Sequence, residues 1–320
     1  MALNIGRKGW IGIGKETSPG VPVVIADYVP FTENTLKPMH EPIPNEAAYG
    51  VREKTFDASL GKKWSEGDVT INCDSDDVGF FLLGALGTDT PANVAGSVYD
   101  HVITRNNSNT PQTFTVTNDR GVDRQYYRSM AVKSLEFSVS DALVEAKASL
   151  IGKFPITTTS GTLTTASGGL YSFGDARFAF GATVAAAGSA TNLKPHDMKL
   201  KIENNTVATF RHGSYEPDTI DHGEFEATAE GSVYFETTTE RDNYYNLDKQ
   251  AASFKLSGQG LGGGYSSSLE FRMYRTHFET FELETGLSDF YAEKFTIRCD
   301  YDNANSKSID AVLRNVRASY

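Results

Sequence analysis

One pattern of residues occurs twice in the chain, in residues 66–81 and again in residues 230–245. Both copies begin with Glu-Gly and then alternate apolar with polar residues, as in a strand with one buried face. In the first copy Val69, Ile71 and Cys73 share that face. Both copies then change to hydroxyl residues, acidic residues and an aromatic pair. A repeat that changes period at the same point in both halves predicts the duplication of a supersecondary unit.

A short amphipathic helix is predicted after the strand in each copy. In the first copy Ser75 is the expected N-cap, and Asp76 and Asp77 would lie in the first turn, near the positive end of the helix dipole. The apolar residues that follow have helical spacing. In the second copy Thr239, or its neighbour Thr238, is the expected N-cap.

Most of the remaining chain has the pattern of β-hairpins. Segments such as 132–139 alternate with a period of two, and Asn-, Pro-, Gly- or Asp-containing turns separate them. The pair of segments within 132–151 recurs within 280–297. These patterns predict an all-β protein with short flanking helices and two duplicated units. The expected divisions are an N-terminal arm at 1–30, a first β unit at 31–156, a linker rich in Thr, Ser, Gly and Ala at 157–191, and a second β unit at 192–320.

The composition favours a soluble globular protein, with 39% hydrophobic and 22% charged residues in a chain of 320. No apolar run approaches the roughly 18 residues that a membrane helix needs, and the N-terminus lacks the apolar region of a signal peptide. We therefore expect synthesis in a cytoplasm and no membrane partner. The net charge of −11 argues against a protein that grips nucleic acid by its phosphates. It is compatible with a surface past which DNA slides, because like charges repel.

No pattern of catalytic or metal-binding residues is found in the sequence. The six histidines include no pair spaced for a shared metal, and no G-x-S-x-G nucleophile motif occurs. The two cysteines, Cys73 and Cys299, are too few for a disulfide framework or a four-thiolate site, and we expect both to be reduced. We expect no enzyme, no cofactor and no metal. Paired carboxylates of the glycosidase kind stay open at this point, because their separation is a three-dimensional quantity.

Two local patterns resemble ligand sites but have a simpler structural explanation. Residues 9–15 have the glycine and lysine spacing of a phosphate loop, yet Glu16 stands where Ser or Thr should hold magnesium. Asp74, Asp76 and Asp77 have a spacing that suits calcium, but Ala85 stands where the loop needs a Glu. Helix capping is the favoured explanation of the three aspartates, and no nucleotide site is expected.

Short motifs occur in an order that resembles one protein family. They are Gly14-Lys15-Glu16-Thr17 with Pro19-Gly20, residues 30–36, Gly50-Val51-Arg52, Glu66-Gly67-Asp68-Val69, residues 80–87 and Tyr99-Asp100-His101. Each motif is short, and their order carries the resemblance together with the repeat. The chain resembles the tail tube (major tail) proteins of bacteriophages with long, non-contractile tails.

The resemblance implies a fold and an assembly. Each unit would be β-sandwich or β-barrel-like with a flanking helix, and units would join side by side into a ring with a continuous inner β-barrel. Rings would stack into a tube around a tape-measure protein, and DNA would pass through the lumen without specific binding during ejection. In this family one unit per chain gives a hexameric ring. The duplication therefore favours a trimeric, pseudo-hexameric ring over a hexamer.

The resemblance also implies partners and a location. The protein would belong to the virion tail, be assembled in the host cytoplasm, and contact the tail terminator and distal tail proteins. The arm and the loop at residues 38–65 are the candidates for contacts between rings. Within them we single out Lys15, Glu16, Gly50 and Arg52.

A second hypothesis is a two-sandwich binding module, such as a virion decoration protein or a carbohydrate-binding adhesin. It predicts exposed aromatic platforms, for which Tyr244, Tyr245 and Tyr265 are the candidates. An enzyme is the least favoured interpretation, because the sequence carries no positive sign of one.

Overall fold

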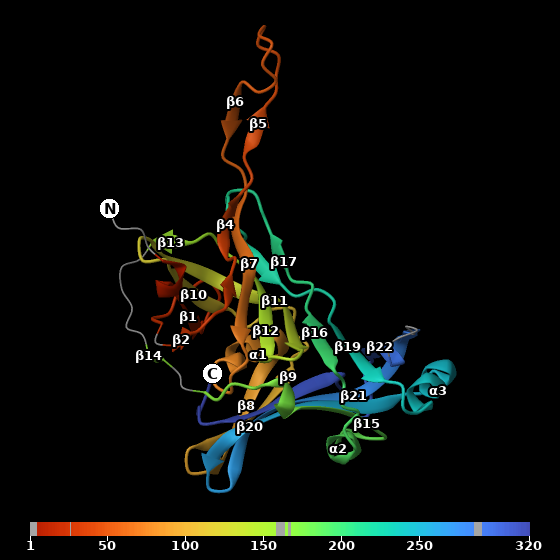
Figure 1. Ribbon diagram of the computed structural model, residues 1–320. Helices are drawn as coiled ribbons and strands as arrows, with labels where there is room; N and C mark the ends of the chain where they lie inside the picture. The colour runs from red at the N-terminus through yellow and green to blue at the C-terminus, as the bar shows by residue number, and fades with distance from the viewer. Residues whose placement is uncertain (1–4, 26, 158–163, 166–167, 285–289) are drawn as a thin grey trace.

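The computed structural model of the chain describes residues 5–25, 27–157, 164–165, 168–284 and 290–320, and strands dominate it (Figure 1). The helices are α1 (Val78–Leu86), α2 (Val184–Ser189) and α3 (Thr239–Asn246), with short 3-10 turns η1 (Gly6–Lys8) and η2 (Phe173–Asp175). The strands are β1 (Trp10–Lys15), β2 (Asp27–Val29), β3 (Glu33–Asn34), β4 (Lys37–His40), β5 (Ile43–Asn45), β6 (Asp57–Ser59), β7 (Lys63–Asn72), β8 (Gly87–Ala95), β9 (Val98–Arg105), β10 (Phe114–Asp119), β11 (Arg124–Val139), β12 (Glu145–Gly152), β13 (Ile156–Thr157), β14 (Thr164–Thr165), β15 (Ala176–Gly181), β16 (Asp197–Glu203), β17 (Val207–Thr209), β18 (Thr219–Asp221), β19 (Glu226–Tyr234), β20 (Gln250–Gly262), β21 (Tyr265–Glu284), β22 (Ala292–Cys299) and β23 (Ile309–Asn315). The predicted all-β class with short helices is confirmed.

An antiparallel sheet, here called the central sheet, runs through both halves of the chain. Its order is β3 and β4 at one edge, followed by β7, β12, β11, β16, β19, β22 and β21. The pairing of β11 with β16, here called the internal junction, joins strands of the first half to strands of the second. Within the described residues the two ends of this sheet do not pair with each other, so the single chain forms no closed barrel.

Two long strands, β11 and β21, leave the central sheet and continue into an outer layer. The first part of β11 pairs with β10, which pairs with β1, and β1 pairs with β2. The first part of β21 pairs with β20 on one side and β23 on the other. Beyond β23 the same sheet continues with β9 and β8. Because β9 comes from the first half of the sequence and β23 is the last strand, the two halves interlock (Figure 1).

The segments expected at the ends of the units are part of the sheets. The predicted N-terminal arm supplies β1 and β2, and Ile11 and Ile13 of β1 are buried. The predicted linker supplies α2 and β15, which pairs with β20. Residues 158–163 and 166–167 of that linker lie outside the described residues. The division of the chain at residues 30, 156 and 191 stays a proposal.

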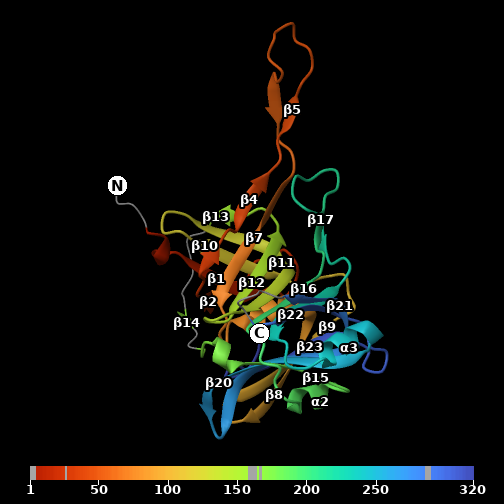
Figure 2. The same cartoon turned by 45° about the vertical axis from the view of Figure 1, so that its right-hand side comes forward.

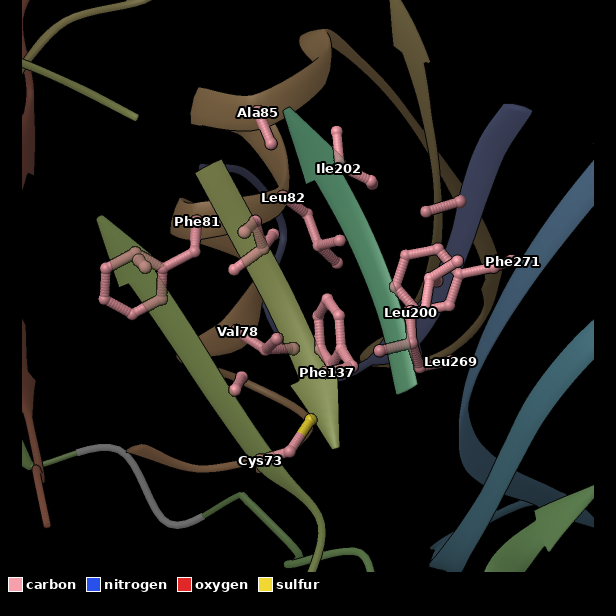
Figure 3. Close-up of a cluster of buried hydrophobic side chains, with 14 of the residues drawn as sticks. Cys73, Val78, Phe81, Leu82, Ala85, Phe137, Leu200, Ile202, Leu269 and Phe271 are labelled. Atoms are coloured by element: carbon pink, nitrogen blue, oxygen red, sulfur yellow. The ribbon is translucent and has the colours of Figure 1, made fainter. Parts of the chain in front are cut away.

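Helix α1 packs on the core face of the central sheet, where both halves meet (Figure 3). Every residue of α1 is buried, and Leu82 points toward Phe137 and Ile202 on strands either side of the internal junction. The ring of Phe137 in turn meets Phe271 of β21, with centroids 4.8 Å apart. Burial of this kind stabilises by roughly 25 cal/mol per Å² of apolar surface. The halves therefore share one hydrophobic core.

The duplication is visible in the pairing of strands, although the Glu-Gly motifs are not its equivalent points. Both long strands carry a bulge, between Val132 and Ser134 in β11 and between Phe278 and Thr280 in β21. When the bulges are superposed, Ser149 corresponds to Thr296, and through their partners Asp68 corresponds to Glu230. The two Glu-Gly motifs therefore lie at positions of β7 and β19 that differ by two residues when the strands are superposed. A shift of two keeps every side chain on its face, so the predicted buried faces were right.

The two glycines of the motifs have different structural roles. Gly67 has φ of +154°, and a Cβ there would lie 2.5 Å from Cα of Leu36, so it permits the edge segment to cross β7 closely. A Cβ at Gly231 would instead meet the Phe295 ring, at 2.7 Å. The shared Glu-Gly therefore revealed the repeat without marking equivalent positions.

The first helix begins two residues later than its predicted cap requires, whereas the second begins directly after one of its two candidate caps. Helix α1 begins at Val78 with Asp77 in the cap position, so Ser75 is not the N-cap. The side chain of Asp74 accepts hydrogen bonds from the N–H groups of Asp76 and Asp77, each at 2.7 Å, and makes a turn ahead of the helix. In the second copy Thr238, one of the two candidate caps, occupies the cap position, and the other candidate, Thr239, is the first helical residue. The helices are where the pattern placed them, whereas their first turns depend on contacts outside the repeat.

Candidate assembly surfaces

One face of the central sheet is polar and carries charges of both signs. The alternation that buries one face leaves the other face polar on every strand. Ion pairs cross between strands, such as Lys147 with Asp68 (2.9 Å), and Arg298 with Glu226 (3.0 Å). The acidic residues of this face are Glu33, Glu66, Asp68, Glu136, Glu145, Asp197, Glu203, Glu226, Glu230, Glu279, Glu282 and Glu284. The basic residues are Lys37, Lys133, Lys147, Lys199, Lys201, Lys294 and Arg298, so the face is acidic in balance.

The central sheet ends in two open edges. At one end, β3 and β4 pair with β7 on their inner side. At the other end, β20 accompanies β21 as far as Thr276, and among the described residues no strand continues beside Thr280–Glu284 on that side. Leu283 on this edge is 44% exposed although it lies on the core face. Unpaired edges are templates for another strand, so both ends of the sheet are candidate interfaces.

A hairpin of residues 43–59, here called the projecting hairpin, extends far beyond the body (Figures 1 and 2). Among the described residues, its strands β5 and β6 pair only with each other. Near its tip the rings of Tyr49 and Phe56 stack with centroids 3.9 Å apart, and both stay substantially exposed. Ile43 and Val51 are exposed as well. Exposed apolar side chains gathered on an isolated projection are typical of a contact surface.

The structure places the four predicted contact residues in two regions. Gly50, with φ of +74°, and exposed Arg52 lie on the projecting hairpin. Lys15 is exposed at the end of β1 and donates a hydrogen bond to the backbone oxygen of Tyr320 (3.1 Å). Glu16 is only 3% exposed, which removes it from the candidates for contacts between rings.

Glu16 has a structural role inside the chain. Its carboxylate accepts hydrogen bonds from the hydroxyls of Thr113 and Thr115, at 2.8 and 2.9 Å. It also accepts from the N–H groups of Gly20 (2.9 Å) and Ser129 (3.0 Å). Four donors satisfy a buried carboxylate and offset the cost of its burial. Glu16, which does not fit the phosphate-loop pattern, therefore connects the N-terminal segment to β10 and β11 through these hydrogen bonds.

The three aspartates before α1 lie beneath the C-terminal segment. The Tyr320 ring packs against Phe80 and His101, and its hydroxyl donates to the backbone oxygen of Asp76 (2.7 Å). Burial, followed by the neighbouring Asp74 charge, raises the pKa of Asp77 to about 8. The described residues contain no group of three or more His, Cys, Asp or Glu side chains arranged to hold a metal ion.

Two buried carboxyl groups face each other under α3. Glu293 is 1% exposed, and neither of its carboxylate oxygens has a hydrogen-bond partner among the described residues. Glu240 of α3 is also buried and accepts a hydrogen bond from the Thr237 hydroxyl (3.1 Å). Burial, with a smaller contribution from Glu240, raises the pKa of Glu293 to about 7, while Arg241 opposes the rise. At neutral pH the second unit therefore holds a carboxyl group that is close to half-protonated.

The raised pKa of Glu293 predicts a pH-dependent stability. The folded chain keeps the proton up to about pH 7, whereas an unfolded glutamate releases it near its ordinary value of 4.5. The stabilising contribution is therefore complete below pH 4.5 and is lost as the pH rises toward 7. We expect Glu293→Gln to unfold several degrees higher than the unmodified chain at pH 8 and at nearly the same temperature at pH 4.5. Thermal unfolding at the two pH values checks this, and an equal shift at both would contradict it.

The aromatic residues proposed for the rival binding module do not form one platform. Tyr244 on α3 stacks on Phe281, with centroids 5.9 Å apart, and is half-buried. Tyr245 is exposed beside it. Tyr265 begins β21, at the far end of that strand, and lies under the Arg314 guanidinium (5.3 Å). These three tyrosines therefore do not offer a shared surface for a glycan.

Comparison with known proteins identifies the family of the chain. A family model described as phage tail tube protein matches residues 6–284, which is most of the chain. No curated protein matches the sequence. Among the described residues no helix has the length and apolarity needed to cross a membrane. The chain belongs to the phage tail tube protein family, and it is a structural protein of the virion tail.

Proposed function

We propose that three copies of this tail tube protein close into a ring, and that the rings stack into a conduit for DNA around a tape-measure protein. The internal junction is the observation that carries this proposal. It joins two equivalent strand groups edge to edge within one chain, and each end of the central sheet offers the same kind of edge again. A head-to-tail contact of this kind closes into a ring when its rotation permits. Two units per chain then give six units from three chains.

The polar face of the central sheet is proposed to line the lumen. The opposite face is buried against α1 and the outer layer, so the polar face is the one left for solvent. Its acidic balance repels the phosphates of DNA, while the interspersed lysines keep the repulsion moderate. DNA would slide along such a wall without specific binding.

The projecting hairpin is proposed to join one ring to the next. It reaches beyond the body, and its exposed aromatic pair suits a hydrophobic contact with a neighbouring copy. Gly50 and Arg52 stay candidates for this contact, and Lys15 is a candidate on the body. Tail terminator and distal tail proteins would meet the first and last rings, and assembly would take place in the host cytoplasm.

Electron microscopy of the concentrated protein tests the proposal. We expect rings with a central hole, and stacks of them as the concentration rises. The polar lining predicts that these assemblies form without DNA. A protein that stays monomeric at all concentrations, with and without the tape-measure protein, would contradict the proposal.

A further inference from the structure

The register of the contact between chains can be derived from the internal junction. Resting on the proposed ring, we infer that the open edge of β21 pairs with the β3–β4 edge of the next chain, with Glu282 opposite Lys37. The occupant of each edge is therefore a second copy of this chain, bound through its other edge. The internal junction is the template for this contact, because it joins strands of the two equivalent halves within one chain.

The template is fully described within one chain. In the internal junction Glu136 lies opposite Lys201, Phe137 opposite Leu200, and Ser138 opposite Lys199. The Lys199 ammonium also reaches Glu136 diagonally, with Nζ 3.1 Å from Oε1. Oppositely charged residues on facing strands stabilise such a pair of strands and disfavour other registers.

The residues of β21 that are equivalent to those of β11 are found by aligning the bulges of the two strands. Ser134 and Thr280 each come directly after the bulge in their strands. Counting on from them, Glu136 corresponds to Glu282 and Phe137 to Leu283. The correspondence is chemically consistent, since an acidic residue replaces an acidic residue and an apolar residue replaces an apolar one.

The residues of the β3–β4 edge that are equivalent to those of β16 are found from the strands with which the two elements pair, β7 and β19. Lys201 pairs with Thr228 of β19, and Lys37 pairs with Glu66 of β7. Thr228 and Glu66 occupy equivalent positions, because each lies two residues before a member of the equivalent pair Glu230 and Asp68. Lys37 therefore corresponds to Lys201, and the preceding Leu36 corresponds to Leu200.

Transfer of the template gives three pairs between chains. Glu282 faces Lys37, Leu283 faces Leu36, and Glu284 faces Thr35. Leu283, 44% exposed in the single chain, then takes the place that Phe137 holds at the internal junction, where it is fully buried. Burial of this leucine would contribute to closing the ring.

Two features of the β3–β4 edge limit where the pairing can run. The Leu36 N–H donates to the side chain of Asn34 (2.9 Å), so this donor is covered until a partner strand replaces the amide oxygen. Pro38 has no N–H to give to a ladder and ends the pairing after Lys37. Both features protect the edge from indiscriminate pairing and confine it to the register derived above.

Cysteine cross-linking tests this register. Residues directly opposite on antiparallel strands have Cα atoms about 4.5–5.5 Å apart, within reach of a disulfide. We expect a chain carrying Glu282→Cys and Lys37→Cys, with Cys299→Ser, to oxidise into a covalently closed species of three chains. A matched control carries Glu282→Cys with Thr35→Cys, which keeps the face but shifts the partner by two residues. Its yield is expected to be at least tenfold lower, because diagonal neighbours lie at about 7–8 Å.

The outcomes separate the register from the proposed function. Rings seen by microscopy, with cross-linking equal in both variants or stronger in the control, would overturn the register and leave the ring proposal intact. Absence of rings from the unmodified chain would overturn the ring proposal itself. Charge exchange gives a second readout that needs no disulfide. Glu282→Lys is expected to weaken ring formation at least tenfold, and Glu282→Lys with Lys37→Glu to restore it.

Discussion

Chains without the tip of the projecting hairpin are expected to form rings but no tubes. The change removes residues 46–56 and joins Asn45 to Asp57 through Asn-Gly, which suits a two-residue hairpin turn. Because the hairpin pairs only with itself, the body should fold and unfold as before. Tube length by electron microscopy and thermal unfolding measure the two effects.

A pair of smaller substitutions refines this prediction. Tyr49→Ser with Phe56→Ser keeps the hairpin but removes the stacked aromatic pair, and we expect short stacks instead of long tubes. Tyr245→Ser is the matched control, since this exposed tyrosine lies on α3, away from the hairpin. Tubes of normal length from the shortened hairpin would show that rings stack through another surface.

Replacement of Tyr320 by alanine is expected to destabilise the chain by about 3–5 kcal/mol, as for other large aromatic truncations in a core. The side chain is 9% exposed and packs edge-to-face on Phe80, with centroids 5.2 Å apart. It fits so closely against α1 that a Cβ at Gly79 would overlap its ring. Chemical denaturation of the purified chain measures the loss.

The Tyr320 hydroxyl can be tested separately from the ring. Tyr320→Phe keeps the packing but leaves the Asn315 amide and the Asp76 carbonyl without this partner. A loss of about 1–3 kcal/mol is expected, smaller than for alanine. A loss below about 1 kcal/mol for Tyr320→Ala would show that the C-terminal segment is not a structural part of the first unit.

The sequence predicted what depends on local periodicity and missed what depends on distant partners. Alternation identified the strands at residues 66–73 and 132–139 and most of their buried faces, because one face of each strand is packed. Val132 departs from the alternation, because the bulge at Lys133 turns its side chain into the core together with Leu135. The pairing of β9 with β23 could not be foreseen, since it joins segments more than 200 residues apart. Strand periodicity also hid the displacement of the Glu-Gly motifs, because a shift of two residues leaves the alternation unchanged.

The contact residues were likewise predicted where the signal is local and missed where it depends on distant partners. The sequence singled out a loop at residues 38–65, and the projecting hairpin with Gly50 and Arg52 lies within it. Glu16 was misjudged because nothing local indicates that Thr113, Thr115 and Ser129 converge on it. The pair of Glu282 and Lys37 was not recognised from the sequence. The inferred register rests on aligning β21 with β11 at the bulges at Lys133 and Glu279, which become visible only once the strands are paired.

The symmetry and mass of the assembled ring test the central claim most directly. A cryo-EM reconstruction of the rings, with their mass from native mass spectrometry, determines both. We predict three chains per ring, threefold symmetry that approaches sixfold in the inner wall, and β21 beside β3–β4 of the next chain. Six chains related by sixfold symmetry, or an inner wall interrupted between chains, would contradict it.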